Sequence, residues 1–438
     1  MESRQRKFDI LILGATGFTG KFVARDLYRF TQQKGLKWAA AGRSRSKLED
    51  TIQWIGDVQI PIVVVDVFDT ASLAAAAKSA RILLNCIGPF RFSGSNVVAA
   101  CIAAGTDYLD ISGEPEFIER ILAFSRDAVS AGVTVVPCCG FDSVPADLGN
   151  LFVKQEFSKR GFTATQVEMY INLAHGPSGI TGNYATYESA VHGLANAHAL
   201  RRLRKDANRT PLPIIGPKLP LYGSARFEKL FTKKWCFPFF GADATVVRIS
   251  QQLVETTRRE NDLDSKALLQ PTQFNAYISA DSIFQLFGLA FFGASMYYLT
   301  PYKWGRKLLL AYPRFFSLGL FTKQGPSDLQ LKESAFISTF AAKGYKKLIS
   351  QTNDVDPKNA PLEYEIVATV AGPESGYVTT PICILQCAFR ILVDRNSNTG
   401  LVPHGVLTPA AAFQKTSLIS ELVASGISFT IQSEKNLI

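Results

Sequence analysis

Three glycines near the start of the chain have a spacing that suits phosphate binding. Gly14, Gly17 and Gly20 follow the apolar run Phe8-Asp-Ile-Leu-Ile-Leu, which has the composition of a buried parallel strand, and a helical pattern begins directly after them. Glycine permits a tight turn and a close approach of the backbone, and a helix N-terminus attracts anions. The spacing therefore predicts a site for a dinucleotide pyrophosphate, with a purely structural turn as the alternative. The residues expected to line this turn are Gly14, Thr16, Gly17, Phe18, Thr19 and Gly20.

A cationic, hydroxyl-bearing corner follows the second apolar run. Arg43, Ser44 and Lys47 come directly after Trp38-Ala-Ala-Ala-Gly, and no carboxylate occurs there before Glu49. Sites that prefer NAD usually carry an acid at this corner, which accepts a hydrogen bond from the ribose 2′-hydroxyl. A cationic corner fits a 2′-phosphate instead, so the sequence favours NADP(H) over NAD(H). A solvated basic loop is the alternative.

Polar and turn residues also end the later apolar runs of this region. Asp66 and Asn85 each close such a run, and Gly88 and Pro89 follow Asn85 closely. The fourth strand of a nucleotide-binding sheet meets the nicotinamide ribose at the corresponding point. We therefore expect Asp66, Asn85, Gly88 and Pro89 to contact the cofactor, whereas ordinary strand-ending turns are the competing interpretation.

Four side chains are candidates for moving a proton. Glu114 and Asp142 stand at predicted strand ends, and His175 and Tyr184 flank a glycine-rich loop. Carboxyl, imidazole and phenol groups all serve as general acids or bases. Each also has a structural interpretation, since Asp142 precedes Ser-Val-Pro and fits a helix N-cap, and His175 would fasten its loop. The sequence leaves the choice among the four open.

Strands and helices must alternate through the first third of the chain to position these residues. Apolar runs are separated there by stretches of helical length, and they end at Leu13, Gly42, Asp66, Asn85, Asp110 and Val136. This order predicts an α/β fold in which residues 1–150 form a Rossmann domain with a doubly wound parallel sheet. Ligands of such sheets lie at the carboxyl ends of the strands, where the candidate residues occur.

The pattern changes after Asn150 and predicts a second domain. Residues 151–377 are expected to form an α+β domain with a mixed or antiparallel sheet, for substrate binding or dimerisation. Its predicted strands are 166–174, 245–259, 273–280 and 362–371. Residues 378–438 are predicted to form helices that pack back on the first domain, because 380–392 is apolar on more than one face.

Composition argues against several classes of function. The chain has 438 residues and a net charge of +10, but no helix interleaves basic and aromatic residues, so nucleic-acid binding is not expected. The seven cysteines form no C-x-x-C pair and the four histidines are isolated, so no metal site is predicted. The N-terminus leads into the first strand without an apolar leader, which favours a location facing the cytosol.

The segment 282–321 fits neither domain. Its first half is uncharged through Tyr302, and a basic bend then precedes a second apolar arm; the bend contains Lys303, Arg306 and Lys307. The first arm nearly reaches the length that spans a bilayer, which is about 20 residues. We expect the two arms to enter a membrane leaflet or a lipid-droplet monolayer as a hairpin. A helix buried between domains or in a homodimer, and a full membrane span, are the alternatives.

Seven motifs occur in a fixed order: Gly14-Ala-Thr-Gly-Phe-Thr-Gly, Ala41-Gly-Arg-Ser, Leu84-Asn-Cys-Ile-Gly-Pro-Phe, Asp110-Ile-Ser-Gly-Glu, Gly140-Phe-Asp-Ser-Val-Pro-Ala-Asp, Gly372-Pro-Glu-Ser-Gly-Tyr-Val-Thr-Thr-Pro and Gly405-Val-Leu-Thr-Pro-Ala-Ala-Ala-Phe. Together they resemble the saccharopine dehydrogenase-like oxidoreductases, a family related to the trans-acting enoyl reductases. The resemblance covers essentially the whole chain. It also includes the apolar insert, which it links in animal members to lipid droplets and other membranes.

The resemblance implies an NAD(P)H-dependent oxidoreductase but no particular substrate. No Tyr-x-x-x-Lys pair occurs in the chain, so the proton relay of short-chain dehydrogenases is absent. Combined with the apolar insert, the resemblance favours an apolar or lipid-related carbonyl or enoyl substrate at a droplet or membrane surface. The alternative is a nucleotide-binding but non-catalytic interaction protein at the same surface.

Overall fold

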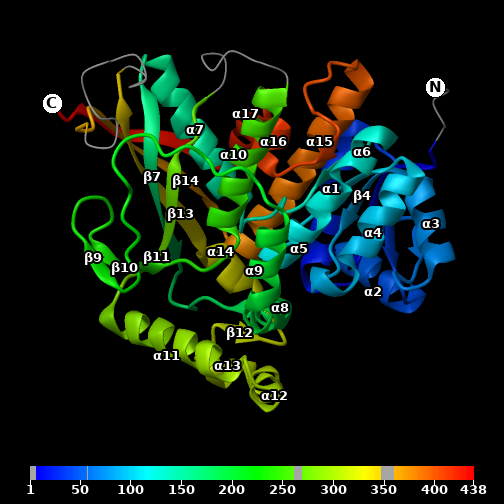
Figure 1. The fold of residues 1–438 in the computed structure, drawn as a ribbon. Coiled ribbons are helices and arrows are strands. Elements are labelled where there is room, and N and C mark those ends of the chain that lie inside the picture. Colours follow the sequence, from blue (N-terminus) through cyan, green and yellow to red (C-terminus); the bar gives the residue numbers. More distant parts are fainter. Residues whose placement is uncertain (1–5, 57, 261–268, 347–359) are drawn as a thin grey trace.

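Two seven-stranded sheets, with helices between them and around them, form the structure (Figure 1). The computed structural model describes residues 6–56, 58–260, 269–346 and 360–438. The first sheet is parallel throughout and has the strand order β15-β6-β5-β4-β1-β2-β3. Its strands are β1 (Phe8–Leu13), β2 (Trp38–Gly42), β3 (Ile62–Val64), β4 (Ala80–Asn85), β5 (Asp107–Asp110), β6 (Thr134–Val136) and β15 (Gly405–Val406).

Both faces of the first sheet are buried, as the alternating side chains of β1 show. Ile10 and Ile12 pack into one apolar cluster, whereas Leu11 and Leu13 pack into the cluster on the opposite face. The helices of this first region are α1 (Phe18–Lys34), α2 (Arg45–Ile55), α3 (Thr70–Ser79), α4 (Phe90–Ala104), α5 (Pro115–Ile121), α6 (Ser125–Ala131) and α7 (Val144–Lys159). The predicted doubly wound parallel sheet is confirmed.

The second sheet is mixed, with the order β16-β14-β13-β7-β11-β10-β9. Strands β7 and β11 are parallel, and the other neighbouring pairs are antiparallel. Its strands are β7 (Thr163–Ala174), β9 (Arg226–Glu228), β10 (Lys234–Pro238), β11 (Gln273–Ala280), β13 (Ala335–Tyr345), β14 (Tyr364–Pro373) and β16 (Ser428–Asn436). A small parallel pair joins β8 (Gly182–Asn183) to β12 (Phe321–Thr322). The predicted α+β character of this part is confirmed.

The stretch 245–259, predicted as a strand, lies instead in the helix α10 (Asp243–Glu260). The β-branched run Thr245-Val-Val favoured the strand interpretation. In the structure Val246 and Ile249, three positions apart, face the same buried cluster, which is a helical repeat. Tertiary packing of this apolar stripe outweighs the local strand propensity. The remaining helices before the insert are α8 (Tyr184–Ala195) and α9 (Ala197–Asp206).

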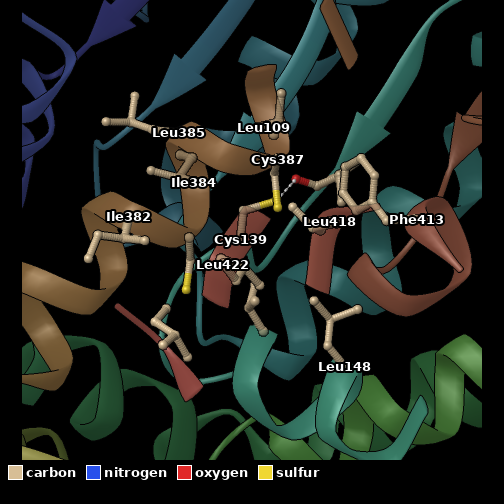
Figure 2. Close-up of a cluster of buried hydrophobic side chains, with 14 of the residues drawn as sticks. Leu109, Cys139, Leu148, Ile382, Ile384, Leu385, Cys387, Phe413, Leu418 and Leu422 are labelled. Carbon is tan, nitrogen blue, oxygen red and sulfur yellow. Dashed lines mark hydrogen bonds between the residues drawn. The ribbon is translucent and has the colours of Figure 1, made fainter. Parts of the chain in front are cut away.

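The C-terminal segment ties the two sheets together. The expected helices are present as α15 (Thr380–Ser397), α16 (Pro409–Phe413) and α17 (Leu418–Ala424). Strand β16 follows them, so the segment ends in a strand of the second sheet, which was not predicted. Figure 2 shows Leu385 and Cys387 of α15 in one cluster with Leu109 and Phe413. Among the described residues, Ser375–Ser397 is the one helix long and apolar enough to cross a membrane, and 72% of its apolar window is buried inside the protein.

The apolar insert forms three helices at one edge of the molecule (Figure 1). They are α11 (Ile283–Leu299), α12 (Lys303–Ala311) and α13 (Pro313–Phe316), and α14 (Asp328–Glu333) follows β12. Met296 is the one buried residue of α11, whereas Phe284 is 83% exposed. A helix buried between domains, one of the alternatives, does not describe α11, because most of its aromatic side chains are exposed.

Candidate cofactor and active site

The glycine turn has the geometry that a pyrophosphate needs. Gly14 has φ +85°, in the left-handed region, and a Cβ there would lie 2.7 Å from Ile87. A Cβ at Gly20 would lie 2.1 Å from the carbonyl oxygen of Gly14, so strand and helix meet closely only because Gly20 has none. Gly17 is the N-cap of α1, which has neither a side-chain cap nor an acidic residue in its first turn. The helix N-terminus is therefore available to an anion.

At the corner after β2, the cationic side chains have no acidic partner among the described residues. Arg43 and Lys47 are exposed, and among the described residues neither pairs with a carboxylate. Ser44 is the N-cap of α2 and accepts a hydrogen bond from the backbone N–H of Lys47 at 3.4 Å. Thr16 of the glycine turn reaches the same corner, since its methyl group would lie 3.8 Å from a Cβ at Gly42. The residues present thus fit a dinucleotide that carries a 2′-phosphate.

The other predicted cofactor residues lie at strand ends but differ in accessibility. Gly88 is exposed, Pro89 is half-buried as the N-cap of α4, and Asp66 is exposed at the end of β3. Asn85 is fully buried: its Nδ2 donates to the Tyr108 hydroxyl at 3.1 Å, and its Oδ1 accepts from the backbone N–H of Ile87 at 3.0 Å. Asn85 therefore orders the backbone that leads to Gly88.

Glu114 is buried and holds neighbouring helices together. Its carboxylate accepts from the backbone N–H groups of Phe90 at 2.8 Å and Arg91 at 3.1 Å. It also pairs with the buried Arg91 guanidinium at 3.1 Å and accepts from the Ser189 hydroxyl of α8 at 3.2 Å. Both carboxylate oxygens are thus occupied, which points to a structural role at the junction of α4, α5 and α8.

Asp142 lies at the same edge of the sheet and is free. Within the described parts of the chain, neither of its carboxylate oxygens accepts a hydrogen bond or pairs with a cation. The side chain reaches solvent, yet protein atoms crowd it, and this desolvation raises its pKa above the usual range. Gly113 makes room for it, since a Cβ at Gly113 would lie 2.7 Å from Asp142 Oδ2. Asp142 has the accessibility and the raised pKa of a general acid.

Two acid–base groups near Asp142 were not predicted as site residues. Tyr377 is buried, its oxygen accepts from the backbone N–H of Asn183 at 2.7 Å, and burial with the charges of Glu374 and Asp142 raises its pKa. Asp243 is buried, and desolvation with the charges of Asp142 and Asp147 raises its pKa well above the usual range. Tyr377 stands in the motif beginning at Gly372, which could have signalled it. Asp243 lies just before the stretch 245–259, and no sequence motif singled it out.

The structure gives His175 and Tyr184 no contact with Asp142 or Glu114. The His175 ring is exposed, and its Nδ1 lies 2.9 Å from the carbonyl oxygen of Gly176. The Tyr184 hydroxyl donates to Glu188 at 3.5 Å, and its ring packs on the cluster that supports α11 and α12. In the described residues, no three His, Cys, Asp or Glu side chains are grouped to hold a metal ion.

The chain is similar to known proteins over its whole length. Residues 10–136 match the family model described as the saccharopine dehydrogenase NADP binding domain. A human "saccharopine dehydrogenase-like oxidoreductase" is 36% identical over 452 residues, covering 100% of both chains. An Arabidopsis thaliana "probable mitochondrial saccharopine dehydrogenase-like oxidoreductase" is 37% identical, covering 98% of this chain and 97% of that one. A Caenorhabditis elegans "lipid droplet localized protein" is 33% identical, covering 98% and 100%.

A solved structure has the same fold. The apo saccharopine dehydrogenase (L-Glu forming) of Saccharomyces cerevisiae aligns with a TM-score of 0.52 at 14% identity, covering 98% of this chain and 100% of that one. The solved protein therefore shares the overall fold of this chain. The family match confirms NADP(H) as the cofactor predicted from the corner at Arg43. With full-length identities above one third, the chain belongs to the saccharopine dehydrogenase-like oxidoreductase family and its first domain is an NADP-binding domain.

Proposed function

We propose that this protein uses NADPH to reduce an apolar, lipid-related carbonyl or enoyl compound that it takes from a lipid surface. The observation that carries the proposal is that the chain passes from the exposed apolar helices α11–α13 to Gly325, which lies against Phe18 of the glycine turn. The name of the C. elegans relative points to lipid droplets, and that of the Arabidopsis relative points to mitochondria. The proposed place of action is a lipid surface.

The exposed aromatic side chains of α11–α13 support attachment to lipid. Those that project most are Phe284, Phe287, Tyr297, Tyr298, Trp304, Tyr312 and Phe315. Burying large apolar side chains contributes about 1.5–3 kcal/mol each, which suffices for stable attachment. Lys303 and Lys307 are exposed beside them and suit anionic headgroups. Arg306 serves differently, because its Nη1 donates to the carbonyl oxygens of Thr300 and Pro301 and so caps α11.

The chain runs from these helices to the glycine turn of the cofactor site. After α13, strand β12 pairs with β8, and Leu320 accepts from the backbone N–H of Gly182 at 2.7 Å. Three residues beyond β12, Gly325 has φ +74°, and a Cβ there would lie 2.5 Å from the Phe18 ring of the glycine turn. Tyr377 contacts the same ring, with centroids 4.8 Å apart. A molecule leaving the lipid beside α13 would therefore enter next to the cofactor.

The free carboxyl of Asp142 provides the proton in the proposed reaction. NADPH, when bound, supplies a hydride to the electrophilic carbon of the substrate. The oxygen or carbanion that then gains charge takes a proton from Asp142, and solvent protonates the carboxylate again. The raised pKa of Asp142 favours the protonated acid that this step needs. Tyr377 borders the same space and orients the substrate oxygen.

The test is NADPH oxidation with a long-chain enal and a long-chain ketone in phosphatidylcholine vesicles. We expect turnover in the wild type and its loss in Asp142→Asn, with NADPH affinity unchanged in that variant. Phe284→Glu together with Phe287→Glu should lower turnover on vesicles but not NADPH binding. The matched control adds the same charges on exposed positions of α15 and α17, Val393→Glu with Val423→Glu, at the opposite end of the molecule (Figure 1).

The outcomes separate the two functions. No turnover with either substrate class, while NADPH binds and the protein still attaches to vesicles, would overturn the proposal in favour of a nucleotide-binding interaction protein. Turnover that is insensitive to the aromatic substitutions would overturn delivery from lipid. Full activity of Asp142→Asn would remove Asp142 as the proton donor.

A further inference from the structure

A polar cavity opens on the outer side of α5 and α10. It has a volume of about 440 Å³ and is lined by Glu119, Arg204, Arg209, Arg248 and Gln252, together with Pro211 and Leu212. Ile118 and Ile249, each next to a lining residue on these two helices, pack with Cys138 in a buried cluster. None of the lining residues belongs to the glycine turn, to the corner at Arg43 or to the surroundings of Asp142, so the cavity is separate from the NADP site.

Three guanidinium groups and a single carboxylate line this cavity. Glu119 is buried and pairs with Arg204, at 3.2 Å between Nε and Oε1, and with Arg209. Arg204 also donates to the Thr245 hydroxyl at 2.9 Å. Among the described residues, Arg248 has neither an ion-pair nor a hydrogen-bond partner, although it lines the cavity and reaches solvent. The three arginines and the one glutamate therefore leave two positive charges without a negative partner.

The surroundings of Arg248 lower the pKa of its guanidinium. Burial, and then repulsion from Arg204 and Arg209, lower the pKa of Arg248 to about 10. The guanidinium still carries its charge at neutral pH, so the three cations repel one another continuously. A bound multivalent anion would relieve this repulsion and complete the hydrogen bonding of Arg248.

We propose that this cavity binds a ligand bearing a phosphate monoester or diphosphate, held by Arg204, Arg209 and Arg248. Arginine matches phosphate because its planar fork donates two parallel hydrogen bonds. The volume lies in the range of small-molecule sites, and Pro211 and Leu212 offer an apolar wall for an organic group. The ligand is either a soluble phosphate compound or a phosphorylated lipid headgroup. This site is independent of the reaction proposed above.

The test is calorimetric titration of the full chain with inorganic pyrophosphate while NADP⁺ saturates the cofactor site. We expect binding to the wild type, and an affinity at least about tenfold weaker in Arg248→Ala, since a charge-assisted hydrogen bond is lost. Arg202→Ala is the matched control, because Arg202 lies exposed on α9, two residues from Arg204, and should bind as the wild type does. Without anion, the Tm of Arg248→Ala should equal or exceed that of the wild type, because a repelled charge has been removed.

Vesicles distinguish the source of the phosphate. They are used with the Phe284→Glu, Phe287→Glu background, so that α11 does not attach the protein. Binding to phosphatidylinositol bisphosphate vesicles that Arg248→Ala abolishes would assign a lipid headgroup, and binding of pyrophosphate alone would assign a soluble ligand. Absence of pyrophosphate binding in the wild type, or equal affinity in the wild type and Arg248→Ala, would overturn the proposal.

Discussion

At the residue scale, the two carboxyl groups proposed from sequence occupy opposite environments at one sheet edge. Glu114 accepts hydrogen bonds from two backbone N–H groups and one hydroxyl and pairs with Arg91, whereas Asp142 has no such partner in the described chain. Strand ends can be placed from sequence, because apolar runs and turn residues mark them. The partners of a buried carboxylate come from distant elements, here Ser189 of α8, and sequence patterns carry no such information.

The cationic corner yields a prediction at the same scale. Arg43→Ala should weaken NADPH binding by about ten- to a hundredfold and change NADH binding little, since only NADPH carries the 2′-phosphate and a charge-assisted hydrogen bond contributes about 1.5–3 kcal/mol. Calorimetric titration with each cofactor measures this difference. Arg126→Ala on α6 is the control, because Arg126 is equally exposed but lies on another helix of the first domain. Equal losses for both cofactors would show that Arg43 supports the fold of the corner.

At the element scale, the first sheet was predictable and α10 was not. Most parallel strands of the first region are short, nearly continuous apolar runs, a pattern that strands buried on both faces produce. α10 contains Thr245-Val-Val near its start, a run with the same local character, and its helical state follows from packing against α5 and α7. The helix brings Arg248 to a surface cavity and Asp243 close to Asp142, and the strand interpretation of 245–259 predicted neither placement.

The helix α15 yields the element-scale prediction. Leu385 is fully buried in the cluster that includes Ile10 of β1 and Phe340 of β13, so one core spans both sheets. Leu385→Ala should lower the free energy of unfolding by about 2–5 kcal/mol through lost burial and the cavity left behind. Val393→Ala, at an exposed position of the same helix, should change it by less than about 0.5 kcal/mol.

Urea unfolding followed by circular dichroism and by tryptophan fluorescence measures both variants. Coincident transitions are expected, because the shared core couples the two sheets. Two separate transitions, with only one shifted by Leu385→Ala, would contradict a common core.

At the scale of the whole molecule, the proposed attachment through α11–α13 would fix how the protein faces a lipid surface. Figure 1 shows α11–α13 at one end and α15 and α17 at the other, so attachment through the aromatic side chains leaves the first sheet accessible to soluble NADPH. The 17 residues of α11 are fewer than the roughly 20 that span a bilayer. With Lys303 and Lys307 beside it, α11 fits a position within one leaflet, since cations cannot cheaply cross hydrocarbon.

This orientation predicts which tryptophan touches lipid. Trp304 is 62% exposed on α12, and Trp54 is 44% exposed on α2 of the first domain. Vesicles of brominated phosphatidylcholine should quench the fluorescence of the wild type and of Trp54→Phe but not that of Trp304→Phe. Added anionic lipid should strengthen binding, and salt should weaken that gain by screening Lys303 and Lys307. Quenching that survives in Trp304→Phe would contradict this orientation. A stable dimer in solution that hides Trp304 without lipid would instead assign α11–α13 to a subunit interface.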